Sequence, residues 1–191
     1  IDEGAKQVVE VKVPESWKTA ADEGLVTTHA ESGRQAAVDF VNNIQAKVSA
    51  QEGNSLPVSA FKDYVDGTTP SGTSAYEKRG IAVNIPVWNA ENCIQCNRCS
   101  YVCPHAAIRP VAMTEAEAAA APAEMKTLAM TGMADKKFAI VVSALDCTGC
   151  GSCANVCPGK KGAKALDMAN MEANAACQSA FDYAVTLPEK A

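Results

Sequence analysis

The sequence of 191 residues is poor in aromatic side chains (5%), contains two histidines and has no long apolar run. A helix that crosses a membrane needs about 18 or more consecutive apolar residues, so the sequence excludes such a span. The net charge of −5 provides no basic footprint for nucleic-acid binding. His29 and His105 belong to no recognisable pattern of carboxylate and nucleophile. The sequence therefore offers no candidate catalytic residue.

Cysteine, in contrast, is abundant, and eight of the nine cysteines form two runs with identical spacing, C-x2-C-x2-C-x3-C-P. The first run consists of Cys93, Cys96, Cys99 and Cys103, and the second of Cys147, Cys150, Cys153 and Cys157. Each cysteine of the second run lies 54 positions after its counterpart (147 − 93 = 54), which indicates an internal duplication. Cys177 lies apart in an Ala-rich helical stretch and is interpreted as a small buried hydrophobic residue.

Disulfides, zinc and iron–sulfur clusters compete as explanations of the eight cysteines. Disulfides suit small secreted scaffolds, whereas this chain has enough apolar residues (48%) to build a core without them. Zinc usually binds two separated pairs of cysteines, and three cysteines at successive gaps of three do not divide in that way. The runs match the bacterial [4Fe–4S] signature, so we predict two [4Fe–4S] clusters.

The fourth cysteine of each such run normally binds the other cluster, which predicts crossed ligand sets. Cluster one is expected to bind Cys93, Cys96, Cys99 and Cys157, and cluster two is expected to bind Cys147, Cys150, Cys153 and Cys103. Gly149 and Gly151 permit close approach of the backbone to the cluster. Tyr101 is interpreted as a ring packed on a cluster, and His105 as a hydrogen-bonded structural residue and not a ligand.

The predicted fold class is α+β. Short strand-like segments flank the first run (80–88 and 107–113) and the second run (137–145 and 163–168). Strand, cluster loop, short helix and strand, repeated twice, is the pseudo-twofold layout of a two-[4Fe–4S] ferredoxin-like domain, expected at residues 80–170. An inserted helical segment at about 114–136 opens with a capping box of Thr114 and Glu117. Residues 171–191 are expected to form a C-terminal helix and exit linker.

The first 79 residues predict a different organisation. Val9, Val11 and Val13 alternate with charged residues, which is typical of a half-buried strand. A capping box of Ser32 and Gln35 predicts a helix that ends near Gly53, with one apolar face made of Ala37, Phe40, Val41, Ile44 and Val48. These pieces cannot enclose a core, so residues 1–53 are interpreted as the C-terminal part of a preceding α/β domain in a longer polypeptide. Residues 54–79, rich in Pro and Gly, are interpreted as an extended linker.

Beyond the cysteines, several stretches resemble pyruvate:ferredoxin (flavodoxin) oxidoreductase, namely EGNSLPVSAF (52–61), DGTTPSGTSAYEKRGIAVNIPVW (66–88), CPHAAIRP (103–110) and LDCTGCGSCANVCPGKKGAKAL (145–166). Generic ferredoxins lack LPVSAF and GTSAYEKRG, so this resemblance is more specific than the cysteine spacing alone. It implies an enzyme that converts pyruvate to acetyl-CoA on thiamine diphosphate. Thiamine diphosphate, Mg and a third [4Fe–4S] cluster would then lie in other segments, with the eight cysteines here binding the two clusters farther from thiamine.

The resemblance implies an electron-relay segment that passes single electrons through two clusters to ferredoxin or flavodoxin and carries out no other chemistry. It further implies contacts with other domains of the same enzyme, a homodimer of the full enzyme and an anaerobic cytoplasm. Lys160, Lys161 and Lys164 follow the last ligand and are candidates for docking an acidic acceptor. The alternatives are a free-standing dicluster ferredoxin, a ferredoxin-like subunit of another redox complex, or a structural metal module.

Overall fold

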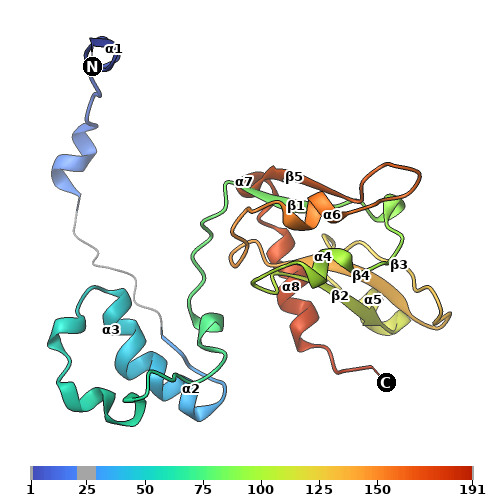
Figure 1. Cartoon of the computed structure of the whole chain (residues 1–191), viewed down its shortest axis with the longest axis horizontal. Helices are drawn as coiled ribbons and strands as arrows, with labels where there is room; N and C mark the ends of the chain where they lie inside the picture. Colours follow the sequence, from blue (N-terminus) through green and yellow to red (C-terminus); the bar gives the residue numbers. More distant parts are fainter. Residues whose placement is uncertain (1, 21–28, 191) are drawn as a thin grey trace. The chain divides into compact units, whose positions relative to one another are not determined.

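The computed structural model describes residues 2–20 and 29–190 (Figure 1). The chain divides into two compact units, the N-terminal unit (residues 1–77) and the C-terminal unit (residues 78–191). Across the described ranges, no helix combines the length and the apolar character needed to cross a bilayer. Both cysteine runs lie in the C-terminal unit, so that unit alone positions the candidate site.

The N-terminal unit is built around one helix that contains a π-helical turn. Its elements are α1 (Asp2–Lys6), the 3-10 helix η1 (Glu15–Thr19), α2 (Gln35–Phe40), the π-helical η2 (Val41–Gln45), α3 (Ala46–Ser49) and the 3-10 helices η3 (Gly53–Ser55), η4 (Val58–Tyr64) and η5 (Thr73–Tyr76). The helix buries Ala37, Val41 and Ile44, in agreement with the predicted apolar face. At η2, the Ala46 N–H donates to the carbonyl of Val41, five residues earlier. The extra residue in this turn rotates the helix, so Ala46 is buried and Val48 is 53% exposed.

Two predictions for the N-terminal unit are wrong. Val9 and Val11 are each 77% exposed, and the described residues of this unit contain no strand. A strand is stable only beside hydrogen-bonded neighbours, so alternating valines without such a neighbour remain irregular. The helix begins at Gln35 with Arg34 at its N-cap and no side-chain cap, so the predicted capping box of Ser32 does not form.

The segment predicted as an extended linker, residues 54–79, folds back on this helix as far as Glu77. The rings of Phe40 and Tyr64 meet edge to face, with their centroids 5.0 Å apart. The Tyr76 hydroxyl donates to the carbonyl of Ser32 at 2.6 Å. The N-terminal unit therefore extends through the Pro- and Gly-rich region. That residues 1–53 end a preceding α/β domain stays a prediction.

The C-terminal unit contains two small antiparallel sheets. β1 (Asn84–Trp88) pairs with β5 (Leu166–Asn170), and β4 (Lys137–Val142) lies between β2 (Ile108–Met113) and β3 (Leu128–Ala129). The strand that leads into the first cysteine run thus pairs with the strand that leaves the second run. Conversely, β2, which leaves the first run, pairs with β4, which leads into the second. This pairing brings the two runs together, and the mixture of helices and antiparallel strands confirms the predicted α+β class.

The helices of this unit are short, namely η6 (Ala90–Asn92), α4 (Arg98–Tyr101), α5 (Glu115–Ala119), α6 (Ser152–Val156), α7 (Met171–Asn174) and α8 (Cys177–Thr186). β4 forms the centre of the core, with residues 138–142 all buried and Ala180 and Phe181 of α8 in the same cluster. The rings of Trp88 and Phe138 meet edge to face, with centroids 6.2 Å apart. Full burial of a large apolar side chain contributes about 1.5–3 kcal/mol, so this shared core holds the short elements together.

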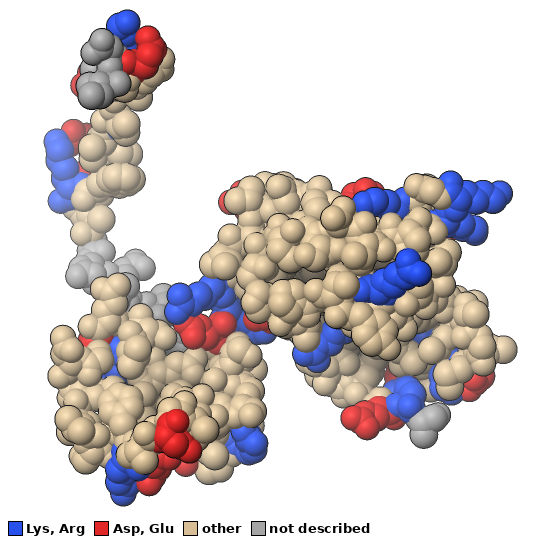
Figure 2. Space-filling view, in the orientation of Figure 1, with Lys and Arg blue, Asp and Glu red and all other residues tan. Residues whose placement is uncertain are grey.

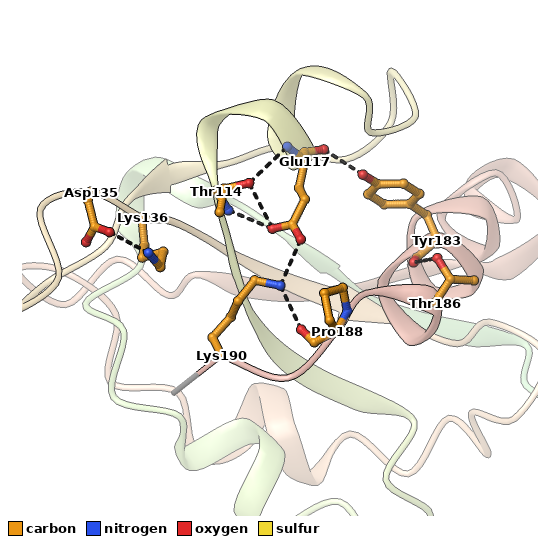
Figure 3. A network of polar contacts seen from close by, with 8 residues as sticks. All are labelled: Thr114, Glu117, Asp135, Lys136, Tyr183, Thr186, Pro188 and Lys190. Atoms are coloured by element: carbon orange, nitrogen blue, oxygen red, sulfur yellow. Dashed lines mark hydrogen bonds and ion pairs between the residues drawn. The ribbon is translucent and has the colours of Figure 1, made fainter.

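Residues 114–136, predicted to be an inserted helical segment, open with the predicted capping box, which is confirmed, but only Glu115–Ala119 are helical and Leu128–Ala129 form β3. The Glu117 N–H donates to the Thr114 hydroxyl at 3.2 Å, and the Thr114 N–H donates to the Glu117 carboxylate at 2.8 Å. The C-terminal end of the chain meets the same residue. Lys190 donates to the Glu117 carboxylate at 2.8 Å, and the Tyr183 hydroxyl donates to the Glu117 carbonyl at 2.7 Å (Figure 3). Glu117 therefore joins the insert to α8 and to the residues that follow it.

Candidate metal centres

Two concave sites in the C-terminal unit are each lined by four cysteines. The first cavity is lined by Cys93, Cys96, Cys99 and Cys157. The second cavity is lined by Cys103, Cys147, Cys150 and Cys153. Each cavity thus combines three cysteines of one run with the last cysteine of the other. These are the combinations that the crossed scheme predicts, and ligation of clusters by them stays a prediction.

The two cysteine loops adopt matching backbone conformations. Gln95 and Asn97 in the first loop have positive φ angles of 57° and 58°, and Gly149 and Gly151, 54 positions later (149 − 95 = 54), have φ angles of 73° and 75°. These left-handed residues turn the chain between successive cysteines. Glycine adopts this conformation without strain, and asparagine tolerates it better than most other residues. The duplication seen in the cysteine spacing is therefore also a duplication of local structure.

Backbone amides of both loops donate to cysteine sulfur. The amide N–H of Gln95 donates to the Sγ atom of Cys93, and that of Gly149 donates to the Sγ atom of Cys147, each with an N···S distance of 3.4 Å. Both donors lie two residues after the first cysteine of their run. The amides of Ala107 and Ala165 lie 3.3 Å from the sulfurs of Cys103 and Cys157. Amides in this position stabilise negative charge on sulfur, which suits thiolates that bind a metal.

Burial governs the pKa of the third cysteine of each run. Burial raises the pKa of Cys99 to about 11 and that of Cys153 to about 11, because an apolar surrounding disfavours the thiolate. A metal ligand must be the thiolate, and the iron of a bound cluster would supply the positive charge that displaces the proton. The remaining lining is largely apolar, including Ile140 and Leu166 in the first cavity and Ile108 and Val142 in the second.

The residues present fit an iron–sulfur cluster better than a single ion. Among the described residues, no three His, Cys, Asp or Glu side chains converge on a point where one metal ion could sit. The four sulfurs of each set instead border a hollow, as a cluster several atoms across requires. The donors are all sulfur, the surroundings are apolar, and amides point at the sulfurs.

The predictions made for other residues from the sequence are in part confirmed and in part wrong. Tyr101 is 88% exposed and lines neither cavity, so its predicted packing on a cluster is wrong: as the last residue of the short α4, its ring extends into solvent. His105 is exposed and borders the second cavity. Cys177 begins α8 and packs against the hydrophobic core, where burial raises its pKa, but it is half-buried and not fully buried as predicted, and its sulfur lies 3.6 Å from the carbonyl of Val142. Lys160, Lys161 and Lys164 are all exposed, and Lys164 donates to the Ala154 carbonyl of α6 at 2.7 Å.

The sequence interpretation missed two polar residues that border the first cavity, Trp88 and Asn97. Their counterparts 54 positions later (142 − 88 and 151 − 97) are Val142 and Gly151, and both border the second cavity. Comparison of the two halves of the duplication, residue by residue, would have identified these differences.

Comparisons with known proteins agree with this geometry. Residues 92–161 match the family model of a 4Fe-4S dicluster domain, a range that contains all eight cysteines of the two runs. Residues 27–82 match a family model, EKR, that is described as a domain of unknown function. The chain is 44% identical, over its whole length, to 16% of the pyruvate-flavodoxin oxidoreductase of Enterobacter agglomerans. It is 47% identical, over 99% of its length, to 16% of the pyruvate:ferredoxin oxidoreductase of Moorella thermoacetica.

The chain is homologous to one segment of these oxidoreductases. A similar segment, 44% identical over 80% of this chain, makes up 8% of the pyruvate dehydrogenase [NADP(+)] of Cryptosporidium parvum. The resemblance predicted from the sequence is therefore confirmed for the whole chain. The chain spans 16% of the length of each of the two oxidoreductases.

Proposed function

We propose that this chain is the electron-relay segment of a pyruvate:ferredoxin or pyruvate-flavodoxin oxidoreductase. The observation that supports the proposal most strongly is the pair of four-cysteine cavities inside the dicluster domain. Among the described residues, neither cavity borders a triad or a paired acid and base that could act on a 2-oxoacid. The segment therefore carries electrons for an enzyme whose other parts bind the substrate.

The proposed ligands follow the crossed scheme. The first cavity would bind a [4Fe–4S] cluster through Cys93, Cys96, Cys99 and Cys157, and the second cavity through Cys147, Cys150, Cys153 and Cys103. Each cluster, when bound, accepts and releases one electron at a time. The chain's own residues would hold the clusters with eight thiolates, leave no iron position open to substrate, and keep water away with apolar side chains. The pseudo-twofold relation between the two halves is part of this proposal.

Two short helices would keep the clusters close together. Cys99 of the first cavity lies in α4, and Cys103 of the second cavity follows two residues after that helix ends. Cys153 of the second cavity lies in α6, and Cys157 of the first cavity follows directly after it. Each short helix therefore carries a ligand for one cavity and leads to a ligand for the other.

The partners and other cofactors are proposed from the relatives. Thiamine diphosphate, Mg and a third [4Fe–4S] cluster would lie in other segments of a homodimeric enzyme in a reducing cytoplasm. Relatives with this segment are named for flavodoxin, ferredoxin and NADP(+), so the segment itself does not determine the final acceptor. We favour ferredoxin or flavodoxin, because Lys160 and Lys161 are exposed on the loop after α6, where Figure 2 shows a group of basic side chains. Residues 1–53 would end a preceding domain.

A comparison of the isolated chain with the full-length enzyme tests the proposal. The reconstituted chain is expected to be reduced by dithionite but to leave pyruvate, CoA and thiamine diphosphate unchanged. In the full-length enzyme, pyruvate and thiamine diphosphate should reduce the same two clusters, as EPR spectra of freeze-quenched samples would record. Reduction of the pure isolated chain by pyruvate, or clusters in the full enzyme that pyruvate cannot reduce, would refute the assignment.

A further inference from the structure

Two buried polar atoms beside the first cavity have no hydrogen-bond partner among the described residues, Trp88 Nε1 and Asn97 Oδ1. An unsatisfied buried donor or acceptor costs about 1–3 kcal/mol, so native structures seldom retain one without a reason. Both residues line the cavity that contains Cys93 and Cys157. Two such atoms at one site indicate that the missing partner is whatever occupies this cavity.

Trp88 is buried beside the cysteines of the first cavity. Its side chain is 8% exposed and lines this cavity, and its Nε1 exposes less than 1 Å² of surface. The sulfur acceptors that line the same cavity are those of Cys93, Cys96, Cys99 and Cys157, and a bound cluster would add its own sulfurs. A buried N–H beside so many sulfur atoms has sulfur as its nearest class of acceptor in the cavity.

Asn97 lies between Cys96 and Cys99, in the left-handed conformation with φ of 58°. It occupies the N-cap of α4, but its side chain makes no capping hydrogen bond. A half-turn of the amide exchanges Oδ1 and Nδ2, which are hard to distinguish without a hydrogen-bond partner. The buried end of this side chain can therefore present two N–H donors to sulfur.

The second cavity lacks both donors, although it has the same backbone arrangement. Val142 and Gly151 stand at the positions that correspond to Trp88 and Asn97 (142 − 88 and 151 − 97, both 54), and neither has a polar side chain. The hydroxyl of Ser152 lies 3.5 Å from the sulfur of Cys150, which is exposed at the rim. The second cluster can therefore serve as a reference within the same molecule.

We propose that Trp88 donates its indole N–H, and Asn97 its side-chain amide, to sulfur of the cluster in the first cavity, and that these bonds raise the reduction potential of that cluster. The inference rests on the proposed function, since it requires a cluster in that cavity. Reduction adds one electron to the cluster and moves no proton. The added negative charge lies partly on sulfur, so an N–H donor stabilises the reduced state more than the oxidised state.

The expected effect can be expressed as a change in the reduction equilibrium. A hydrogen bond gains strength as its acceptor becomes more negative, and loss of one such donor should lower the equilibrium constant for reduction about tenfold. For a one-electron couple, this change corresponds to a potential lower by about 59 mV.

The test is an EPR-monitored redox titration of the reconstituted chain with the variant Trp88→Phe, which removes the N–H and keeps an aromatic ring. The midpoint of one cluster is expected to fall by about 59 mV, and that of the other should stay unchanged. Trp17→Phe is the matched control, because Trp17 is the other tryptophan of the chain and is 69% exposed. It should shift neither midpoint.

Asn97→Gly provides a second, independent variant, because glycine tolerates the left-handed conformation and occurs at the corresponding Gly151. It should lower the midpoint of the same cluster that Trp88→Phe affects, and it decides the question alone if Trp88→Phe fails to fold. Unchanged midpoints in variants that bind both clusters would overturn the inference. A raised midpoint would overturn it too, because it would mean that water entering the vacated space controls the potential. Failure of the wild-type chain to bind iron would instead contradict the proposed function itself.

Discussion

Replacement of Gly159 by alanine is expected to disrupt the loop that carries Cys157. Gly159 has a φ angle of 59°, and a Cβ atom there would lie 1.8 Å from the carbonyl oxygen of Ala163. That oxygen accepts the N–H of Lys160 at 3.0 Å, and the Ala163 N–H donates to the carbonyl of Lys160 at 3.0 Å. The methyl group can be accommodated only if this pair of hydrogen bonds opens and the loop moves.

The magnitude follows from a comparison with Gly162 in the same loop. Gly162 has a φ angle of 86°, and a Cβ atom added there would have no neighbour within 4 Å, so Gly162→Ala introduces backbone strain alone. This strain costs about 1–2 kcal/mol. Gly159→Ala carries a similar strain and also loses two backbone hydrogen bonds, each worth about 0.5–1.5 kcal/mol. We therefore expect Gly159→Ala to destabilise the C-terminal unit by about 1–3 kcal/mol more than Gly162→Ala.

Denaturant unfolding of the two variants, followed by circular dichroism, measures this difference, and iron content reports on the site. Gly159→Ala should unfold at a lower denaturant concentration and should retain less iron in the first cavity, because Cys157 lies two residues away. Equal unfolding midpoints and equal iron contents for Gly159→Ala and Gly162→Ala would refute the steric reasoning.

Three further predictions concern the ligands, the exposed lysines and the C-terminal end. Cys157→Ala should damage the EPR signal of the cluster in the first cavity, although Cys157 belongs to the second run. Replacement of Lys160 and Lys161 by glutamine should slow reduction of an acidic acceptor mainly at low salt, as stopped-flow kinetics would show. The hydrogen bond from Lys190 lowers the pKa of Glu117, so this contact stabilises the fold at neutral pH and is lost as pH falls through the lowered pKa. An NMR titration of Lys190→Met should find the pKa of Glu117 closer to that of free glutamate.

The first two of these predictions have a matched control, and each of the three has a result that would contradict it. Cys177→Ala should leave both EPR signals intact, and damage to the second cavity by Cys157→Ala would reject the crossed scheme. The control for the Lys160 and Lys161 variant replaces Lys47 and Lys62 by glutamine. These two lysines are exposed in the N-terminal unit, so the control removes the same charge. An identical salt dependence in both lysine pairs would reject docking at the loop after α6. An unchanged pKa of Glu117 in Lys190→Met would show that Lys190 is not its partner.

Features that depend on neighbours in the sequence were predictable. The strands β1, β2, β4 and β5, the capping box of Thr114 and Glu117 and the left-handed glycines of the second loop all depend on residues a few positions apart, whereas β3 lies where a helical segment was predicted. The position of Cys157 at the first cavity was also predictable, because the fourth cysteine of a run with this spacing normally binds the other cluster of a pair.

Features that depend on distant contacts were not predictable from local pattern. Valines that alternate with charged residues, as at Val9 and Val11, form a strand only where another strand lies beside them, and both valines are exposed. Val48 is exposed because the π-helical turn rotates the end of the helix, and the spacing of apolar residues in the sequence does not reveal such a turn. The importance of Trp88 emerges only when its N–H is found buried beside four cysteines, since tryptophan in a strand is otherwise an ordinary core residue.

Iron and sulfide analysis of the anaerobically reconstituted chain, with EPR of the dithionite-reduced sample, tests the central claim most directly. Two [4Fe–4S] clusters require about eight iron and about eight sulfide per chain, together with the EPR signal of two interacting reduced clusters. About four iron per chain, or stoichiometric zinc with no sulfide, would contradict the claim that each of the two cavities holds a [4Fe–4S] cluster.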